Sequence, residues 1–262
     1  MAHATTADGA RIWYQGEGHG DPVLLLPGQS LDSRMWGPVA TDLAARHHVI
    51  RMDNRGTGRS EDGTDTDYST ALFARDALAV LTDQGIDRAH VYGFSMGGRV
   101  AQVLATLAPE RVGALVLGAT GPGGTEEFPR SEAANEALRT VSTPAGRAAL
   151  TDLFFTPDWV RDHPELVESV APANSRRSQR RHFIASADHR GWDLLPRITA
   201  PTLVLHGGDD ALTPPENAHR IANRIPGARV RIFDGARHGV HLEARPAASD
   251  AVLDFLARHP LG

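Results

Sequence analysis

Two amino acids are missing from this chain of 262 residues, which contains no cysteine and no lysine. Without thiols it can have no disulfide, no cysteine metal site and no thiol nucleophile. Without lysine it has no Schiff-base amine and no phosphate-loop lysine. Covalent catalysis by this chain therefore has to use Ser, Thr, Asp, Glu, His or Tyr.

Strong charge and long apolar runs are also lacking. The formal net charge is −5 at pH 7, and this mildly acidic balance argues against a nucleic-acid partner, which favours a basic face. No apolar run approaches the roughly 18–20 residues that a membrane span needs. The first six residues carry neither a positive charge nor an apolar stretch, so no secretory signal is expected. We expect a cytoplasmic protein that acts on a small molecule and does not bind a membrane.

Short apolar runs alternate with amphipathic segments along most of the chain. A hairpin is expected at residues 2–14, with its turn at Asp8-Gly9. Further strands are predicted at residues 23–26, 48–52, 90–92, 114–117, 202–206 and 230–233. Helices are predicted at residues 36–45, 69–84, 96–107, 216–224 and 247–257. This alternation predicts an α/β fold with a doubly wound, mostly parallel sheet.

One stretch breaks the alternation. Residues 121–196 open with Gly-Pro-Gly-Gly, contain no clear buried strand and carry helical patterns at 131–141 and 146–155. We therefore predict a core of residues 1–121 and 197–262, and a small helical cap of residues 122–196. The cap is expected to be a lid over an active site; a decorative insertion is the alternative. Four of its aromatic residues are expected either to line an apolar substrate pocket or to pack the cap onto the core: Phe154, Phe155, Trp159 and Trp192.

A G-x-S-x-G motif centred on Ser95 lies between a predicted strand and a predicted helix. This is the context that a nucleophile elbow requires, because glycines let the backbone turn tightly and raise the serine hydroxyl above the sheet. The helix that follows points its first N–H groups toward developing negative charge. Ser95 is therefore the candidate nucleophile.

A serine nucleophile needs a base to take its proton and a carboxylate to orient that base. Asp209 and Asp210 follow the predicted strand at 202–206, and His238 and His241 follow the one at 230–233. Both loops leave the carboxyl ends of strands, where open α/β sheets hold their ligands. By this placement alone, either member of each pair is a candidate.

These motifs resemble those of the α/β-hydrolase fold family, and the resemblance covers nearly the whole chain. It is carried by Pro27-Gly28-Gln29, the Asp-x-Arg-Gly-x-Gly-x-Ser run at 53–60, the Ser95 motif, the G-x-x-D-x-x-x-P run at 207–214, and His238 followed by Glu243. The family pattern implies that Ser95 is the nucleophile, Asp210 the acid and His238 the general base. It also implies that the backbone N–H groups of Gln29 and Met96 form the oxyanion hole. Arg237 stands where the family usually has glycine.

The resemblance implies a cofactor-free serine hydrolase that cleaves a carboxylic ester or lactone, most similar to bacterial 3-oxoadipate enol-lactonases and related small-molecule esterases. Epoxide hydrolases and haloalkane dehalogenases are disfavoured, because these relatives have Asp at the position of Ser95. Alternatives are a carbon–carbon bond hydrolase of a β-diketone with the same triad, and a non-hydrolytic binding protein or cyclase on the same fold. The scattered histidines form no H-E-x-x-H motif, so neither a metal nor another cofactor is expected.

Two further sets of residues, one at 53–56 and one at 176–181, each have both a structural and a functional interpretation. Asp53, Arg55 and Gly56 are expected to form a structural turn, with Arg55 bound to a carboxylate, rather than to take part in catalysis. An arginine run in the cap is expected to be a solvated helix face, although it is also placed to attract an anionic substrate. Its members are Arg176, Arg177, Arg180 and Arg181.

Overall fold

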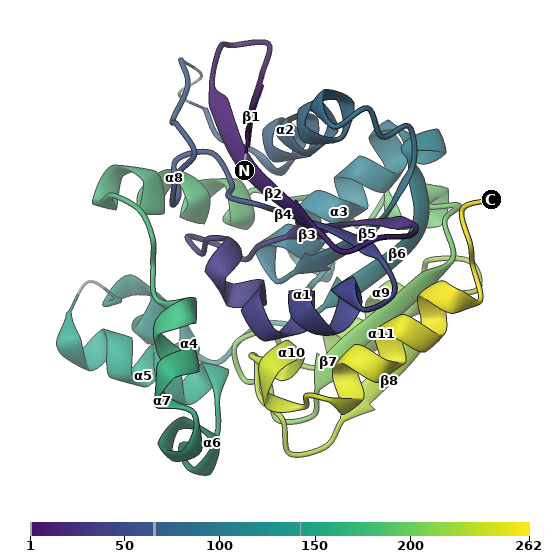
Figure 1. Cartoon of the computed structure of the whole chain (residues 1–262). Coiled ribbons are helices and arrows are strands. Elements are labelled where there is room, and N and C mark those ends of the chain that lie inside the picture. The colour runs from purple at the N-terminus through teal and green to yellow at the C-terminus, as the bar shows by residue number, and fades with distance from the viewer. Residues whose placement is uncertain (1, 65–66, 142) are drawn as a thin grey trace.

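An eight-stranded sheet runs through the protein in the order β1-β2-β4-β3-β5-β6-β7-β8 (Figure 1). The computed structural model describes residues 2–64, 67–141 and 143–262. The strands are β1 (Ala2–Thr5), β2 (Arg11–Glu17), β3 (Pro22–Leu26), β4 (His48–Met52), β5 (Ala89–Phe94), β6 (Val112–Gly118), β7 (Thr202–Gly207) and β8 (Arg229–Phe233). The β1/β2 and β2/β4 pairs are antiparallel, and all other pairs are parallel. The predicted mostly parallel sheet is confirmed.

Helices cover both faces of this sheet. Those of the core are α1 (Gly37–Ala44), α2 (Thr70–Asp83), α3 (Met96–Leu107), α9 (Glu216–Ala222), α10 (Val240–Glu243) and α11 (Ala247–Ala257). Apolar residues of α2, α3 and α9 form one buried cluster with the sheet, and those of α1, α10 and α11 form a second cluster on its other face. The fold is therefore doubly wound, as predicted. The short helix α10 was not predicted, since four residues are too few to show a helical period.

The central strands owe their position to continuous apolar sequence. Every residue of β5, β6 and β7 is buried, as expected for parallel strands covered on both faces. Strand β8 lies at the sheet edge, and its exposed and partly buried residues alternate. The buried strands bring their carboxyl ends to one edge of the sheet, where the loops after β3, β5, β7 and β8 meet.

The chain between β6 and β7 forms helices that lie outside the sheet (Figure 1). They are α4 (Glu132–Arg139), α5 (Pro144–Phe154), α6 (Pro157–Asp162), α7 (Pro164–Val167) and α8 (Arg176–Ala187). The hydroxyl oxygens of Ser131, Thr143 and Ser175 accept backbone N–H groups in the first turns of α4, α5 and α8, which starts these helices at the residues seen. Helix α8 lies apart from α4–α7, across the carboxyl edge of the sheet.

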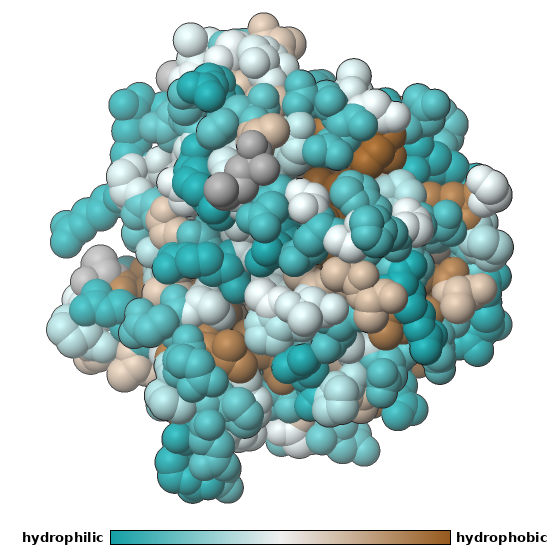
Figure 2. All heavy atoms as spheres, viewed as in Figure 1, coloured by the Kyte–Doolittle hydropathy of each residue, from teal (hydrophilic) through white to brown (hydrophobic). Residues whose placement is uncertain are grey.

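The visible face of the molecule is mostly hydrophilic, and its hydrophobic residues form small separate areas (Figure 2). Among the described residues, no helix combines the length and the apolar composition needed to cross a membrane.

Candidate active site

Ser95 occupies a strained turn between β5 and α3. Its backbone has φ 53° and ψ −118°, a left-handed conformation that costs a non-glycine residue roughly 1–3 kcal/mol. Two hydrogen bonds hold it there: the Ser95 N–H donates to the Gly118 carbonyl at 2.8 Å, and the Thr120 hydroxyl donates to the Ser95 carbonyl at 2.7 Å. The turn raises the Ser95 side chain above the carboxyl edge of the sheet.

The glycines on either side of Ser95 are required by close backbone approach. A Cβ atom on Gly93 would lie 2.2 Å from the Gly97 carbonyl oxygen, and one on Gly97 would lie 2.1 Å from the Leu26 carbonyl oxygen. Both contacts are with backbone atoms, which cannot move aside without displacing β3 or α3. The G-x-S-x-G pattern is therefore a steric requirement of this strand–turn–helix.

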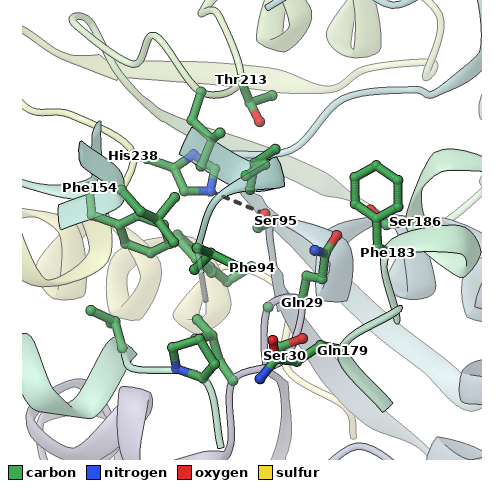
Figure 3. Close-up of a pocket in the computed structure, with 18 of the residues that line it drawn as sticks. Gln29, Ser30, Phe94, Ser95, Phe154, Gln179, Phe183, Ser186, Thr213 and His238 are labelled. Atoms are coloured by element: carbon green, nitrogen blue, oxygen red, sulfur yellow. Dashed lines mark hydrogen bonds between the residues drawn. The ribbon is translucent and has the colours of Figure 1, made fainter. Parts of the chain in front are cut away.

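A chain of hydrogen bonds joins Ser95 to His238 and Asp210. The Ser95 Oγ lies 3.1 Å from His238 Nε2 (Figure 3). His238 Nδ1 lies 2.8 Å from Asp210 Oδ2. Because an ionised carboxylate can only accept, Nδ1 carries the proton, which leaves Nε2 as an acceptor toward the Ser95 hydroxyl. The structure thus brings together the three side chains that the family pattern selects.

Asp210 is buried, and several hydrogen-bond donors stabilise its negative charge. Its Oδ1 accepts the backbone N–H groups of Leu212 at 2.9 Å and Thr213 at 2.8 Å. His206 Nε2 lies 3.2 Å from Oδ2 and 2.6 Å from the Thr213 carbonyl, so this nitrogen carries a proton that points at both acceptors. Burial alone would raise the pKa of the Asp210 carboxyl, but His238 and His206 lower it to about 2. His206 is not among the site residues predicted from the sequence, although it directly precedes the predicted Asp210 loop.

The other candidates for the acid and the base, Asp209 and His241, do not contact Ser95 or His238 through a hydrogen bond. Asp209 is exposed to solvent. His241 is buried, with its ring centroid 4.3 Å from that of Phe94 and 5.3 Å from that of Trp36. Burial lowers the pKa of His241 to about 3, so its ring is neutral. It packs beneath the site and makes no hydrogen bond to Ser95.

Ser95 and His238 open into a cavity of about 370 Å³. Its walls come from the loop after β3, from the Ser95 turn, from the loops after β7 and β8, and from α4, α5 and α8. In Figure 3, Phe154 and His238 lie on one side of Ser95, and Gln179, Phe183 and Ser186 of α8 lie on the other. Core and cap residues therefore enclose the same space.

Of the four aromatic residues expected to line a pocket or to pack the cap onto the core, Phe154 alone lines this cavity, with its ring centroid 4.9 Å from that of His238. The other three do not line it and take the packing alternative. Phe155 is buried against Gly239 and stacks on Trp159 at 4.1 Å, so both fasten the cap to the loop of His238. Trp192 packs on the core beneath Arg224, whose guanidinium lies 4.5 Å from its ring.

The two backbone N–H groups expected in the oxyanion hole are free to receive a ligand atom. Neither Gln29 nor Met96 donates its N–H to another described residue. The loop of Gln29 is held by His182 of α8: the Ser30 N–H donates to His182 Nδ1 at 3.3 Å, and His182 Nε2 donates to the Arg55 carbonyl at 2.8 Å. Nothing in the sequence pattern signalled this contact, because it joins residues that are 152 positions apart.

The loop of His238 is tied to the cap through Glu243. One Glu243 carboxylate oxygen accepts the Arg237 N–H at 2.5 Å, and the other accepts the Thr156 N–H at 2.6 Å. The Arg237 guanidinium also donates to the Phe155 carbonyl at 3.1 Å. Arginine at the position of the family's usual glycine is thus used to bind the cap.

The structure gives different outcomes for the Asp53–Gly56 turn and for the arginine run of α8. Asp53 accepts the Ser33 N–H at 2.8 Å and the Arg59 N–H at 2.9 Å, and Arg55 is bound by Asp76 and Asp8. These are structural contacts away from the cavity, as expected. In the arginine run, by contrast, two of the four residues, Arg176 and Arg180, line the cavity, and the other two do not. No group of three or more His, Asp or Glu residues suited to a metal ion occurs among the residues that the structure describes.

Acid is expected to destabilise this fold below pH 6.5. Burial lowers the pKa of His182 to about 4, and of His189 and His241 to about 3, from an ordinary 6.5. Between pH 6.5 and pH 4 the unfolded chain therefore binds more protons than the folded chain. The free energy of unfolding falls as the pH is lowered through this range. Below pH 4 the lowered pKa of Asp210 adds a loss of the same sign. Thermal unfolding followed by circular dichroism from pH 8 to pH 3 measures this.

The variant His241→Leu isolates one of these groups. It should make the dependence of unfolding free energy on pH shallower by up to about 1.4 kcal/mol per pH unit, the value for one proton. His219 is exposed on α9 and serves as the control, so His219→Gln should leave the slope unchanged. An unfolding temperature that is equal at pH 7 and pH 4.5 would contradict the prediction.

The sheet order, the turn at Ser95 and the placement of the cavity are those of an α/β enzyme. A family model described as the alpha/beta hydrolase fold matches residues 21–245, and the chain belongs to this family. The resemblance noted in the sequence is confirmed.

Three of the proteins similar to this chain are hydrolases by name. A putative carbamate hydrolase, RutD of Azorhizobium caulinodans, is 31% identical over 97% of both chains. The rhodomycin D methylesterase DnrP of Streptomyces peucetius is 30% identical over 94% of this chain and 95% of its own. The crystal structure of an enol-lactonase from Burkholderia xenovorans LB400 matches 95% of this chain and 97% of its own, with a TM-score of 0.81 and 25% identity. The chain is accordingly an enzyme of the hydrolase class.

Proposed function

We propose that the chain is a serine hydrolase that cleaves a carboxylic ester or lactone of a small molecule through an acyl-enzyme on Ser95. The observation that carries this proposal is the hydrogen-bonded chain from Ser95 through His238 to Asp210, whose Ser95 end opens into a partly enclosed cavity. The names of the methylesterase and the enol-lactonase similar to this chain support the same bond types. The roles assigned to the residues require no cofactor.

Acylation uses the groups already in place. His238 Nε2 takes the Ser95 proton as Oγ attacks the carbonyl carbon, and Asp210 stabilises the imidazolium that forms. The N–H groups of Gln29 and Met96 donate to the oxyanion, each contributing about 3 kcal/mol to transition-state stabilisation. The bond from the carbonyl carbon to the leaving oxygen then breaks, and His238 returns the proton to that oxygen.

Deacylation repeats these steps with water. His238 removes a proton from the water as its oxygen attacks the acyl carbon, and the bond to Ser95 Oγ breaks as the serine regains its proton. In a lactone the leaving hydroxyl stays attached to the acyl group, so a single hydroxy acid leaves the site.

Labelling with a fluorophosphonate probe tests this function. The probe phosphonylates an activated serine, so the wild-type protein should gain one label, and peptide mass spectrometry should locate it on Ser95. Ser95→Ala should remain unlabelled, whereas Ser186→Ala, which removes a different serine of the cavity wall, should label normally. Equal labelling of the wild type and Ser95→Ala would refute the proposal, as would absence of label in both.

A further inference from the structure

The cavity has two chemically different walls. Away from α8 the lining includes apolar side chains, with Phe154 next to His238 and with Leu138, Leu150 and Leu212. Across Ser95, helix α8 supplies polar and charged residues: Arg176, Gln179, Arg180 and Ser186, together with Phe183. Figure 3 shows Gln179, Phe183 and Ser186 facing the space opposite Phe154. A substrate with its carbonyl at Ser95 therefore extends one part toward an apolar wall and another toward α8.

The charge on the lining is all of one sign. Among the described residues, the cavity is lined by five arginines and by no carboxylate: Arg99, Arg130, Arg139, Arg176 and Arg180. Three of these have carboxylate neighbours behind the wall. Arg99 and Arg130 lie 2.7 Å and 3.9 Å from Glu127, and Arg139 binds two glutamates of α4.

Arg176 and Arg180 differ from these three. Both are exposed, and neither side chain forms an ion pair or a hydrogen bond with another residue of the described ranges. They are four positions apart on α8, so their side chains lie on one stripe of the helix, next to each other at the cavity. The other two arginines of the run lie on different faces: Arg181 stands 5.0 Å from the Tyr68 ring and 3.9 Å from Asp62, and Arg177 is exposed and does not line the cavity.

Two adjacent guanidinium groups without a counter-ion favour an anion between them. In a partly enclosed cavity their attraction for a negative group exceeds that in bulk water. A guanidinium also matches the planar carboxylate with two parallel N–H donors, which gives orientation as well as affinity. Both residues are exposed, as a solvated helix face requires, but they also line the cavity.

We propose that the substrate is an ester or lactone that carries a carboxylate, and that Arg176 and Arg180 bind this group while the scissile carbonyl lies at Ser95. This proposal rests on the serine-hydrolase function above. The part of the substrate near the reacting bond lies against Phe154 and its apolar neighbours. Helix α8 therefore selects substrates by charge, and the opposite wall selects them by apolar shape.

Paired substrates test the proposal. Two 4-nitrophenyl esters have acyl chains of equal length, one derived from adipic acid and ending in a carboxylate, the other ending in the neutral carboxamide. The wild-type enzyme should hydrolyse the carboxylate ester with the higher kcat/KM, after the spontaneous rate is subtracted. The double variant Arg176→Gln/Arg180→Gln should lower kcat/KM for that ester by about 10-fold to 100-fold. It should lower kcat/KM for the carboxamide ester much less, because that end group carries no charge.

The matched control is Arg177→Gln, which removes the same charge from the same helix outside the cavity wall. It should affect neither ester, and this separates a local contact from the general field of the protein. The preference of the wild type should also weaken as salt is added, because salt screens partly exposed charges. Circular dichroism should give the same unfolding temperature for all three proteins.

The outcomes distinguish the two proposals. If Ser95 is labelled and the carboxamide ester is hydrolysed, but the carboxylate ester has no advantage, the carboxylate site is refuted and the serine-hydrolase function stands. Equal effects of Arg177→Gln and the double variant also refute the site, because they indicate a solvated helix face. If Ser95 is not labelled and neither ester is hydrolysed, both proposals fail.

Discussion

Replacing Ser95 by Ala is expected to lower kcat for ester hydrolysis by about four to six orders of magnitude, and His238→Ala should cost about as much. The reason is the geometry of the chain from Ser95 Oγ to His238 Nε2 to Asp210, in which each group acts only through the next. Without the base the serine hydroxyl keeps its proton, and without the serine the base has no nucleophile to activate. The measurement is kcat on a 4-nitrophenyl ester for which the wild type is active.

The double variant Ser95→Ala/His238→Ala decides whether the residues act as a unit. Its activity should equal that of either single variant, because the first substitution already prevents the other group from taking part in the reaction. Residual activity above the rate in water should remain, since the N–H groups of Gln29 and Met96 are untouched. Losses that multiply in the double variant would show independent roles and would contradict the mechanism.

Ser186→Ala is the matched control for this experiment. Ser186 lines the same cavity, but its hydroxyl and carbonyl oxygens serve the Arg99 guanidinium rather than the reacting groups. Its loss should change kcat far less than the loss of Ser95. A comparable loss would place the chemistry on the α8 side of the cavity.

The sequence predicted most of what is local in this protein. The turn at Ser95 is determined by neighbouring residues, because Gly93 and Gly97 can approach the backbone where no side chain fits. Strands β5, β6 and β7 are continuous apolar runs, so their burial can be read directly. Parallel strands end at one edge, and for this reason the loops after β7 and β8 could be placed beside Ser95. Resemblance to the family pattern then selected Asp210 over Asp209 and His238 over His241.

The cap was harder to predict, because its contacts are set by packing between distant segments. Phe154 and Phe155 are adjacent and chemically identical, yet one lines the cavity and the other is buried against Gly239. Which of the two faces the cavity depends on how α5 ends against the loop of His238. His182 likewise fixes the Gln29 loop from α8, and residue type alone cannot indicate such a contact. Aromatic composition predicted burial here but not position.

Replacing Arg55 by Ala is expected to lower the unfolding free energy by about 3–5 kcal/mol, with kcat retained at temperatures where the variant is folded. The Arg55 side chain is fully buried and binds Asp76 on α2 through two hydrogen bonds of 2.7 Å, as well as Asp8 in the β1–β2 turn at 2.9 Å. Its loss leaves the Asp76 carboxylate, which is 1% exposed, without its buried cation. Chemical denaturation with urea measures the change.

Two further variants separate a buried ion pair from simple loss of packing. Arg55→Met/Asp76→Leu removes both charges and keeps apolar volume, so it should regain much of the lost stability. The pair between Arg11 and Glu61 serves as an exposed control, because these side chains are 56% and 54% accessible, and Arg11→Ala should cost less than about 1 kcal/mol. If the double variant is as unstable as Arg55→Ala, the cost lies in packing rather than in the loss of the buried cation beside Asp76. In either case, a loss of stability with unchanged kcat assigns the Asp-x-Arg-Gly loop to the scaffold rather than to the chemistry.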